Sequence, residues 1–173
     1  DRAYEENYNF SKAPNVPTLT AIPGDNRVTL IWDTFAEESV DPILGRDFEG
    51  YRIYRSTDPG WHDMLEITDG AGSVTYLKPM AQFDLDNEHE GYAAVGVKGI
   101  HLWLGDNTGI VNSFQDTTAI NGFTYYYAVT SYDHGDPAKG IAPSECTRYI
   151  AIDKSGNIEK GSNVAIVRPA APA

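Results

Sequence analysis

The chain of 173 residues is poor in cysteine, because Cys146 is its only one. A single thiol excludes an intrachain disulfide and a metal site built from several cysteines. We expect Cys146 to be a small buried apolar residue. No apolar run approaches the roughly 20 residues of a transmembrane helix, so no membrane span is predicted. The sequence has no initiator methionine and no signal peptide, which predicts a processed product or part of a longer protein.

Motifs that mark common enzyme classes are also missing. There is no G-x-S-x-G elbow, no P-loop, no G-x-G-x-x-G and no C-x-x-C. The histidines are dispersed and have no spacing typical of a zinc site: His62, His89, His101 and His134. We therefore expect a protein that is not an enzyme. A site assembled in space from distant residues remains the alternative.

Basic residues are scarce: 13 lysines and arginines stand against 25 aspartates and glutamates, a net charge of -12. The sequence pI is about 4.5. Such a surface repels phosphate backbones and anionic lipids, which argues against nucleic acid or a membrane surface as a partner. The same surface suits divalent cations or a saline medium.

The residues that are abundant predict an all-β protein. A hydrophobic fraction of 41% argues for a folded chain, and 16 glycines and ten prolines predict many turns. The most informative stretch is Ile120 to Asp133, where the Asn121-Gly122 turn precedes three tyrosines and a period-two pattern. Both faces of this strand are apolar, so we place it in the middle of a sheet.

Other strands follow from alternation and from the turn residues around them. We predict strands at 18–22, 27–32, 49–56, 110–115, 144–152 and 163–168. The strand 144–152 is expected to pair with the tyrosine strand as a hairpin.

Three motifs together resemble a fibronectin type III domain. They are Val28-x-Leu30-x-Trp32, Gly50-Tyr51-x-Ile53 and Asn121-Gly122-x-x-Tyr125-x-Tyr127-x-Val129. The resemblance implies that Trp32 packs under Tyr51 and that Tyr125 forms a tyrosine corner. The phrases around the third motif and APSEC look like modules of bacterial secreted and cell-surface proteins.

The resemblance implies an all-β, immunoglobulin-like antiparallel β-sandwich with an insertion of about 50 residues after the third strand. We divide the chain into an arm or linker (1–13), the sandwich (14–153, with the insertion at 57–112) and a C-terminal extension or linker (154–173). Within the insertion we expect two hairpins, 64–68 with 74–77 and 93–97 with 100–104. We expect these to pack against the sandwich, because their apolar residues need a partner.

An acidic cluster in the insertion is a candidate calcium site. It contains Asp84, Asp86, Asn87, Glu88 and Glu90 in the sequence FDLDNEHEG. Carboxylates at alternating positions can converge on one hard cation. The spacing is not that of an EF-hand, and a solvated acidic loop is the alternative.

Aromatic residues in or beside the insertion are a candidate glycan-binding surface. Trp61, Tyr92 and Trp103 offer rings that can stack on sugars. The alternative is a small apolar core beneath the insertion.

The leading functional hypothesis is a non-enzymatic extracellular module, structural or interacting, within a larger secreted or cell-surface bacterial protein. Its partners would be other proteins or copies of itself, with the end segments 1–16 and 163–168 available for strand addition to a neighbour. A carbohydrate-binding accessory module of a polysaccharide-degrading enzyme is the alternative. An enzyme with its site in the insertion is a third.

Overall fold

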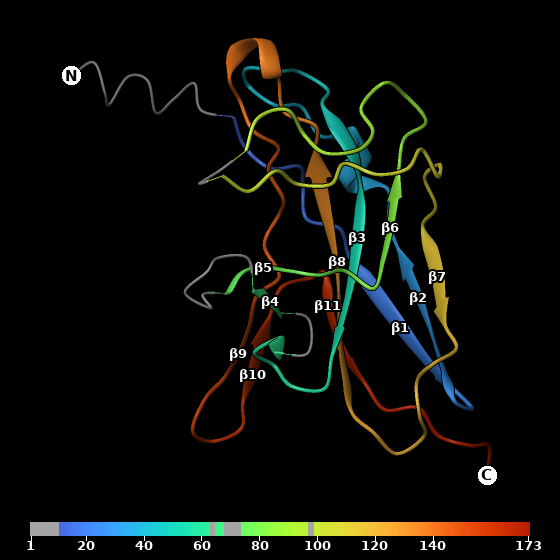
Figure 1. Cartoon of the computed structure of the whole chain (residues 1–173). Helices are drawn as coiled ribbons and strands as arrows, with labels where there is room; N and C mark the ends of the chain where they lie inside the picture. The colour runs from blue at the N-terminus through green and yellow to red at the C-terminus, as the bar shows by residue number, and fades with distance from the viewer. Residues whose placement is uncertain (1–10, 63–64, 68–73, 97–98) are drawn as a thin grey trace.

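The computed structural model describes residues 11–62, 65–67, 74–96 and 99–173, and these form an all-β protein (Figure 1). Its strands are β1 (Leu19–Gly24), β2 (Arg27–Trp32), β3 (Phe48–Ser56), β4 (Leu65–Ile67), β5 (Val74–Leu77), β6 (Ala81–Asp84), β7 (Ser113–Asp116), β8 (Tyr125–Asp133), β9 (Ile150–Ile152), β10 (Ile158–Lys160) and β11 (Val164–Val167). Two short 3-10 helices, η1 (Phe35–Glu38) and η3 (Pro137–Lys139), lie in connections. No helix in the described ranges is long and apolar enough to cross a membrane.

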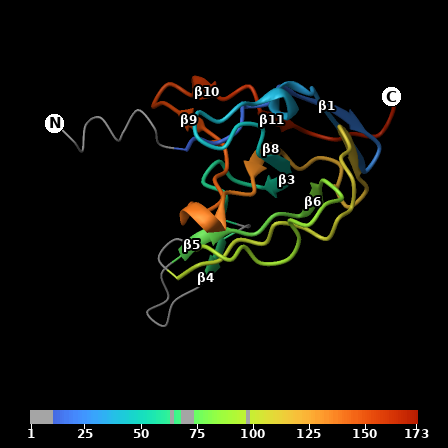
Figure 2. The same ribbon diagram turned by 90° about the horizontal axis from the view of Figure 1, so that it is seen from above.

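Two antiparallel sheets form the body of the molecule. One has three strands in the order β1-β2-β7, and the other has four in the order β11-β8-β3-β6. Figures 1 and 2 show β1, β2 and β7 beside the sheet that contains β3 and β8. The hairpins β4-β5 and β9-β10 form two further small sheets.

The main core lies between the two larger sheets, as in a β-sandwich. Its buried side chains come from alternate positions of β2, β3 and β8: Val28, Leu30, Trp32, Tyr51, Ile53, Tyr125, Tyr127 and Val129. Burial of each of the larger apolar side chains stabilises the fold by about 1.5–3 kcal/mol before conformational entropy is counted. The rings of Trp32 and Tyr51 meet edge to face at 5.5 Å.

The strands with the clearest alternation are confirmed. Those predicted at 18–22, 27–32 and 49–56 correspond to β1, β2 and β3, and the tyrosine strand is β8. β8 lies inside its sheet, paired with β3 on one side and β11 on the other. Eight of its nine residues are buried, so the central position predicted from its two apolar faces is correct.

The predicted strand 144–152 is wrong in its extent and its partner. Segment 144–146 touches the end of β8 only briefly, with the amide of Cys146 donating to the Ser131 carbonyl. Its last residues, β9, pair with β10 instead. The neighbour of β8 is β11, whose Val164 is fully buried. Residues 164–167 therefore belong to the sheet, as its edge strand, and not to a linker.

The predicted hairpin 93–97 with 100–104 is not a ladder of strands in the described residues. One isolated bridge joins Tyr92 to Trp103, and the amide of Ala93 donates to the Leu102 carbonyl at 2.8 Å. Residues 97 and 98 lie outside the described ranges. Among the described residues the two arms are joined by backbone hydrogen bonds near Gly91 and Ala93, a shorter run than a β-ladder needs.

The segment expected as an insertion, 57–112, contributes to the fold in two ways. Its strands β4 and β5 pair as predicted, although their turn, 69–72, lies outside the described residues. Its strand β6 pairs with β3 at the edge of the four-stranded sheet. The predicted strand 110–115 appears as β7, shifted toward the C-terminus.

Candidate functional site

The acidic loop proposed for calcium is built around Asp84, the last residue of β6. Its carboxylate is fully buried and accepts hydrogen bonds from the amides of Asn107 (3.1 Å) and Thr108 (3.0 Å). Gly105 makes room for it, since a Cβ at that position would lie 2.1 Å from Cγ of Asp84. The Asp84 carboxylate therefore holds the loop 105–108 in place. Its oxygens already accept hydrogen bonds from that loop.

The other acids of that loop point elsewhere. Asp86, Glu88 and Glu90 are exposed, and the Glu90 carboxylate accepts a hydrogen bond from the Asn107 side chain at 2.7 Å. In the described chain, the carboxylates that come close enough together to share a metal ion do not include these residues. The structure does not bring the four predicted ligands together.

The three candidate aromatic residues fall into two places. Trp61 is only 6% exposed and packs with Tyr54, Ala128 and Val164, so it presents no ring to solvent. Tyr92 and Trp103 are 72% and 38% exposed, and their rings meet edge to face at 4.8 Å. Only this pair lies at the surface.

A pocket of about 170 Å³ lies beside Tyr92. Its lining combines acidic, imidazole and apolar groups: Glu88, His89, Glu90, Tyr92, Leu104 and His134 are among them. The rings of His89 and His134 stack at 3.7 Å. Burial lowers the pKa of His89, and the charge of the neighbouring His134 lowers it further, so the neutral form of His89 is favoured.

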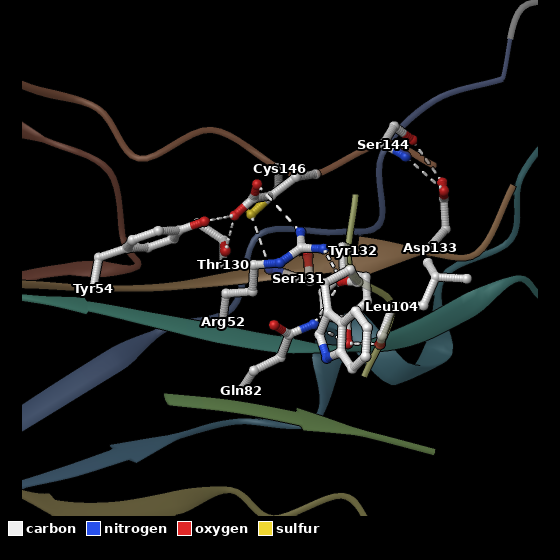
Figure 3. A network of polar contacts seen from close by, with 12 residues as sticks. Arg52, Tyr54, Gln82, Leu104, Thr130, Ser131, Tyr132, Asp133, Ser144 and Cys146 are labelled. Carbon is white, nitrogen blue, oxygen red and sulfur yellow. Dashed lines mark hydrogen bonds and ion pairs between the residues drawn. The ribbon is translucent and has the colours of Figure 1, made fainter. Parts of the chain in front are cut away.

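A buried polar network covers the outer face of the four-stranded sheet (Figure 3). The guanidinium of Arg52 on β3 lies 3.3 Å from the Glu145 carboxylate and 3.9 Å from the ring centre of Tyr132. Glu145 also accepts hydrogen bonds from the hydroxyls of Tyr54 (2.6 Å) and Thr130. Glu145 is partly buried, and Nη1 of the buried Arg52 lies beside its carboxylate without a hydrogen bond among the described residues.

The same network fixes a distant loop. Arg52 and Gln82 both donate to the Trp103 carbonyl at 2.9 Å, and the Tyr132 hydroxyl donates to the Leu104 carbonyl. As expected, this part of the segment 57–112 packs against the sheet. The network ties this loop to the sheet through hydrogen bonds and one ion pair.

A second acidic cluster is the site that the sequence analysis missed. It contains Asp41 after η1, Asp47 just before β3, and Asp133, the last residue of β8. One carboxylate oxygen from each residue lies within 4.8 Å of the others, and all three residues are buried. The antiparallel pairing of β3 with β8 brings two of them together, since Phe48 is opposite Asp133.

Two members of this cluster are tied to loops. Asp41 accepts hydrogen bonds from the amides of Ile43 and Leu44 and from Ser11 and Lys12 of the N-terminal arm. Figure 3 shows Asp133 against Ser144, whose amide (2.8 Å) and hydroxyl (2.6 Å) both donate to it. The cluster therefore joins the arm, the β2–β3 connection and the segment after β8.

The third member is not satisfied. Asp47 is 2% exposed, and its Oδ2 has no hydrogen-bond partner among the described residues. Burial raises the pKa of Asp47 to about 7, with a further contribution from the charge of Asp133. Burial also raises the pKa of Asp133, whereas the donors around Asp41 outweigh its burial and lower its pKa.

This cluster escapes sequence reasoning because its members are far apart in the chain. Each aspartate alone has the usual appearance of a turn or strand-end residue. The signal that was available is the pairing of two confident strands. Had β3 and β8 been paired antiparallel, Asp47 and Asp133 would have met at one end of the sheet.

Comparisons of the chain with family models, with curated proteins and with solved structures found no match. A function therefore has to be argued from the geometry and chemistry of these residues.

Proposed function

We propose that this chain is a non-enzymatic, fibronectin type III-like module, structural or interacting, of a larger secreted or cell-surface bacterial protein. The observation that carries the proposal is the strand order of its two sheets. Its partners would be other proteins or copies of itself.

The strand order supports an immunoglobulin-like module. In that fold the first, second and fifth sandwich strands share one sheet, and the third, sixth and seventh share the other. Here β1, β2 and β7 form one sheet, while β3, β8 and β11 lie together in the other. The remaining strand, β6, lies beside β3.

Two side-chain contacts support the same proposal. The Tyr125 hydroxyl, at the start of β8, accepts a hydrogen bond from the amide of Ile120 at 2.9 Å. A tyrosine corner makes such a contact to the backbone a few residues upstream. Trp32 contacts Tyr51, the other packing that the resemblance implies.

The placement of the acids supports a non-enzymatic role. A catalytic carboxylate needs a shifted pKa and access to a substrate. Burial raises the pKa of Asp47 to about 7 and that of Glu49 to about 8, but neither residue lines the pocket beside Tyr92. Their shifts arise mainly from burial inside the fold.

The path of the chain supports a place in a linear array. Figure 1 shows the described chain entering near one end of the sandwich and leaving at the other end after β11. Modules connected at opposite ends extend a chain without folding it back on its neighbours.

Labelling of the source cells tests the extracellular placement. Antibodies raised against the purified chain should label intact cells as strongly as permeabilised ones, and protease added outside should remove the signal. Labelling that appears only after permeabilisation would contradict the proposal.

A second candidate function is glycan binding, favoured by the exposed pair Tyr92 and Trp103 beside an acidic pocket. An aromatic face provides a stacking surface for a sugar, and the adjacent carboxylates accept its hydroxyl donors. On a glycan array, Tyr92→Ala should abolish any binding seen with the wild type, whereas Phe123→Ala, an exposed aromatic at another turn, should not. Equal binding by both variants would remove this candidate.

A further inference from the structure

We propose that Asp41, Asp47 and Asp133 bind a calcium ion that fastens the N-terminal arm to the end of the sandwich. This site is separate from the acidic loop 84–90 and independent of the extracellular role proposed above.

The spacing of the three carboxylates fits one ion. Calcium binds protein oxygens at about 2.3–2.6 Å, so two ligands of the same ion are at most about 5 Å apart. The oxygens of Asp41, Asp47 and Asp133 lie within 4.8 Å of one another. No hinge or loop movement is needed to bring them into range.

The unpartnered oxygen of Asp47 is a second, independent indication. A buried carboxylate oxygen without a donor destabilises the fold, and more so if it is charged, so folded proteins rarely leave one. Oδ2 of Asp47 is such an atom, and the residue is only 2% exposed. A cation between it and Asp133 supplies the missing partner.

The charges around the cluster point the same way. Three carboxylates lie together, yet no lysine or arginine forms an ion pair with any of them within the described ranges. The donors that reach them are amides and hydroxyls, from Ser11, Lys12, Ile43, Leu44, Gly135 and Ser144. These groups orient the carboxylates and leave most of the negative charge for an ion to neutralise.

The ligand chemistry selects calcium. An all-carboxylate set is hard and lacks the imidazole or thiolate that zinc and copper prefer. Magnesium needs near-ideal octahedral geometry and keeps several waters, whereas calcium accepts irregular sets of six to eight oxygens. Asp133 retains acceptor capacity beside the open oxygen of Asp47, since its carboxylate offers about four lone-pair sites and its donors are two groups of Ser144 and the amide of Gly135.

Calorimetry and thermal melting test the site. After dialysis against EDTA, CaCl2 should titrate with one ion per chain, a Kd of about 10⁻⁴ M or tighter, and an increase in Tm. Magnesium at the same ionic strength should give neither. Limited proteolysis should show the arm, residues 11–17, protected only in calcium.

Two variants separate an ion site from a cluster that only shares a proton. Asp47→Asn should abolish the calcium heat and the Tm shift while folding at least as well as the wild type in EDTA, because it removes a buried like charge. Asp86→Asn, an exposed acid of the loop 84–90, should keep both responses. Absence of a calcium response in the wild type, an equal response to magnesium, or a response retained by Asp47→Asn would overturn the proposal.

Discussion

At the scale of single residues, the Tyr125 hydroxyl fastens the turn before β8 to the strand itself. It accepts a hydrogen bond from the Ile120 amide, and its ring is buried against Tyr127. Tyr125→Phe keeps the ring and removes only the acceptor. We expect a loss of about 1–2 kcal/mol in the free energy of unfolding, because the Ile120 amide loses its partner. Urea denaturation measures it.

Tyr149→Phe is the matched control for that change. Tyr149 is exposed, and its hydroxyl makes no hydrogen bond in the part of the chain that the structure describes. Its free energy of unfolding should stay within about 0.5 kcal/mol of the wild type. Equal losses in both variants would mean that the Tyr125 hydroxyl does not stabilise the corner.

At the scale of elements, Asp116 ties the two sheets together. It ends β7 in the three-stranded sheet, and its carboxylate accepts hydrogen bonds from Arg55 of β3 (2.9 Å) and Tyr127 of β8 (2.6 Å). Burial opposes its ionisation, but the donors from Thr118, Tyr127 and Arg55 prevail and hold its pKa below the usual 3.8. The charged form is therefore favoured in the folded state.

This lowered pKa predicts how stability depends on pH. Below about pH 4 the unfolded chain binds a proton at Asp116 before the folded chain does, so stability present above this range is lost as the pH falls. Asp116→Asn should cost about 1.5–3 kcal/mol near pH 6, and less near pH 2.5. Denaturation curves at several pH values measure the difference. Asp106→Asn, at an exposed loop position, should show no such trend. A gap between Asp116→Asn and wild type that stays constant with pH would contradict the assignment.

The last strand, β11, stabilises the sandwich through Val164. This side chain is fully buried against Tyr54, Trp61 and Ala128. Val164→Ala should lower the free energy of unfolding by about 2 kcal/mol, through lost burial and the cavity left behind. Ile158→Ala in β10, where the side chain is 52% exposed, is the control and should cost well under half as much. Similar thermal melting of both variants would mean that residues 164–167 do not stabilise the sandwich.

The strands that the sequence predicts well are those that carry a strong local pattern of their own. β2, β3 and β8 combine alternation with large buried aromatics, so their periodicity alone locates them. The sequence does not identify the strand that pairs with β8, because segments 144–152 and 163–168 both have the pattern of a strand. The choice between them depends on the long connection after β8, and no local pattern encodes that path.

The candidate sites divide in the same way. Whether Tyr92 is exposed and Trp61 is buried depends on which loop covers each face of the sandwich. The spacing of these residues in the sequence does not determine how the loops are placed. The Asp84 carboxylate looked available in the sequence but is used by the amides of 107 and 108, which lie more than 20 positions away. Convergence of Asp47 with Asp133 follows only after strands have been paired.

At the scale of the whole molecule, the net charge of -12 opposes folding. The excess of acidic residues places many like charges on one compact surface, and their mutual repulsion is weaker in the expanded chain. Salt screens these interactions, with a Debye length that falls from about 30 Å at 0.01 M to about 3 Å at 1 M. Buried pairs such as Arg52–Glu145 are screened much less than the exposed acids.

We therefore expect the Tm at neutral pH, in EDTA, to rise by several degrees when NaCl increases from about 0.01 M to about 0.5 M. Tetramethylammonium chloride should produce the same increase, because the effect is general screening and not binding of sodium. Near pH 4.5, the sequence pI, the net charge is close to zero and the salt effect should largely disappear. Scanning calorimetry provides all three comparisons. A Tm that is independent of salt at neutral pH, or a salt effect that is as large near the pI, would show that the surface charge does not limit the stability of this fold.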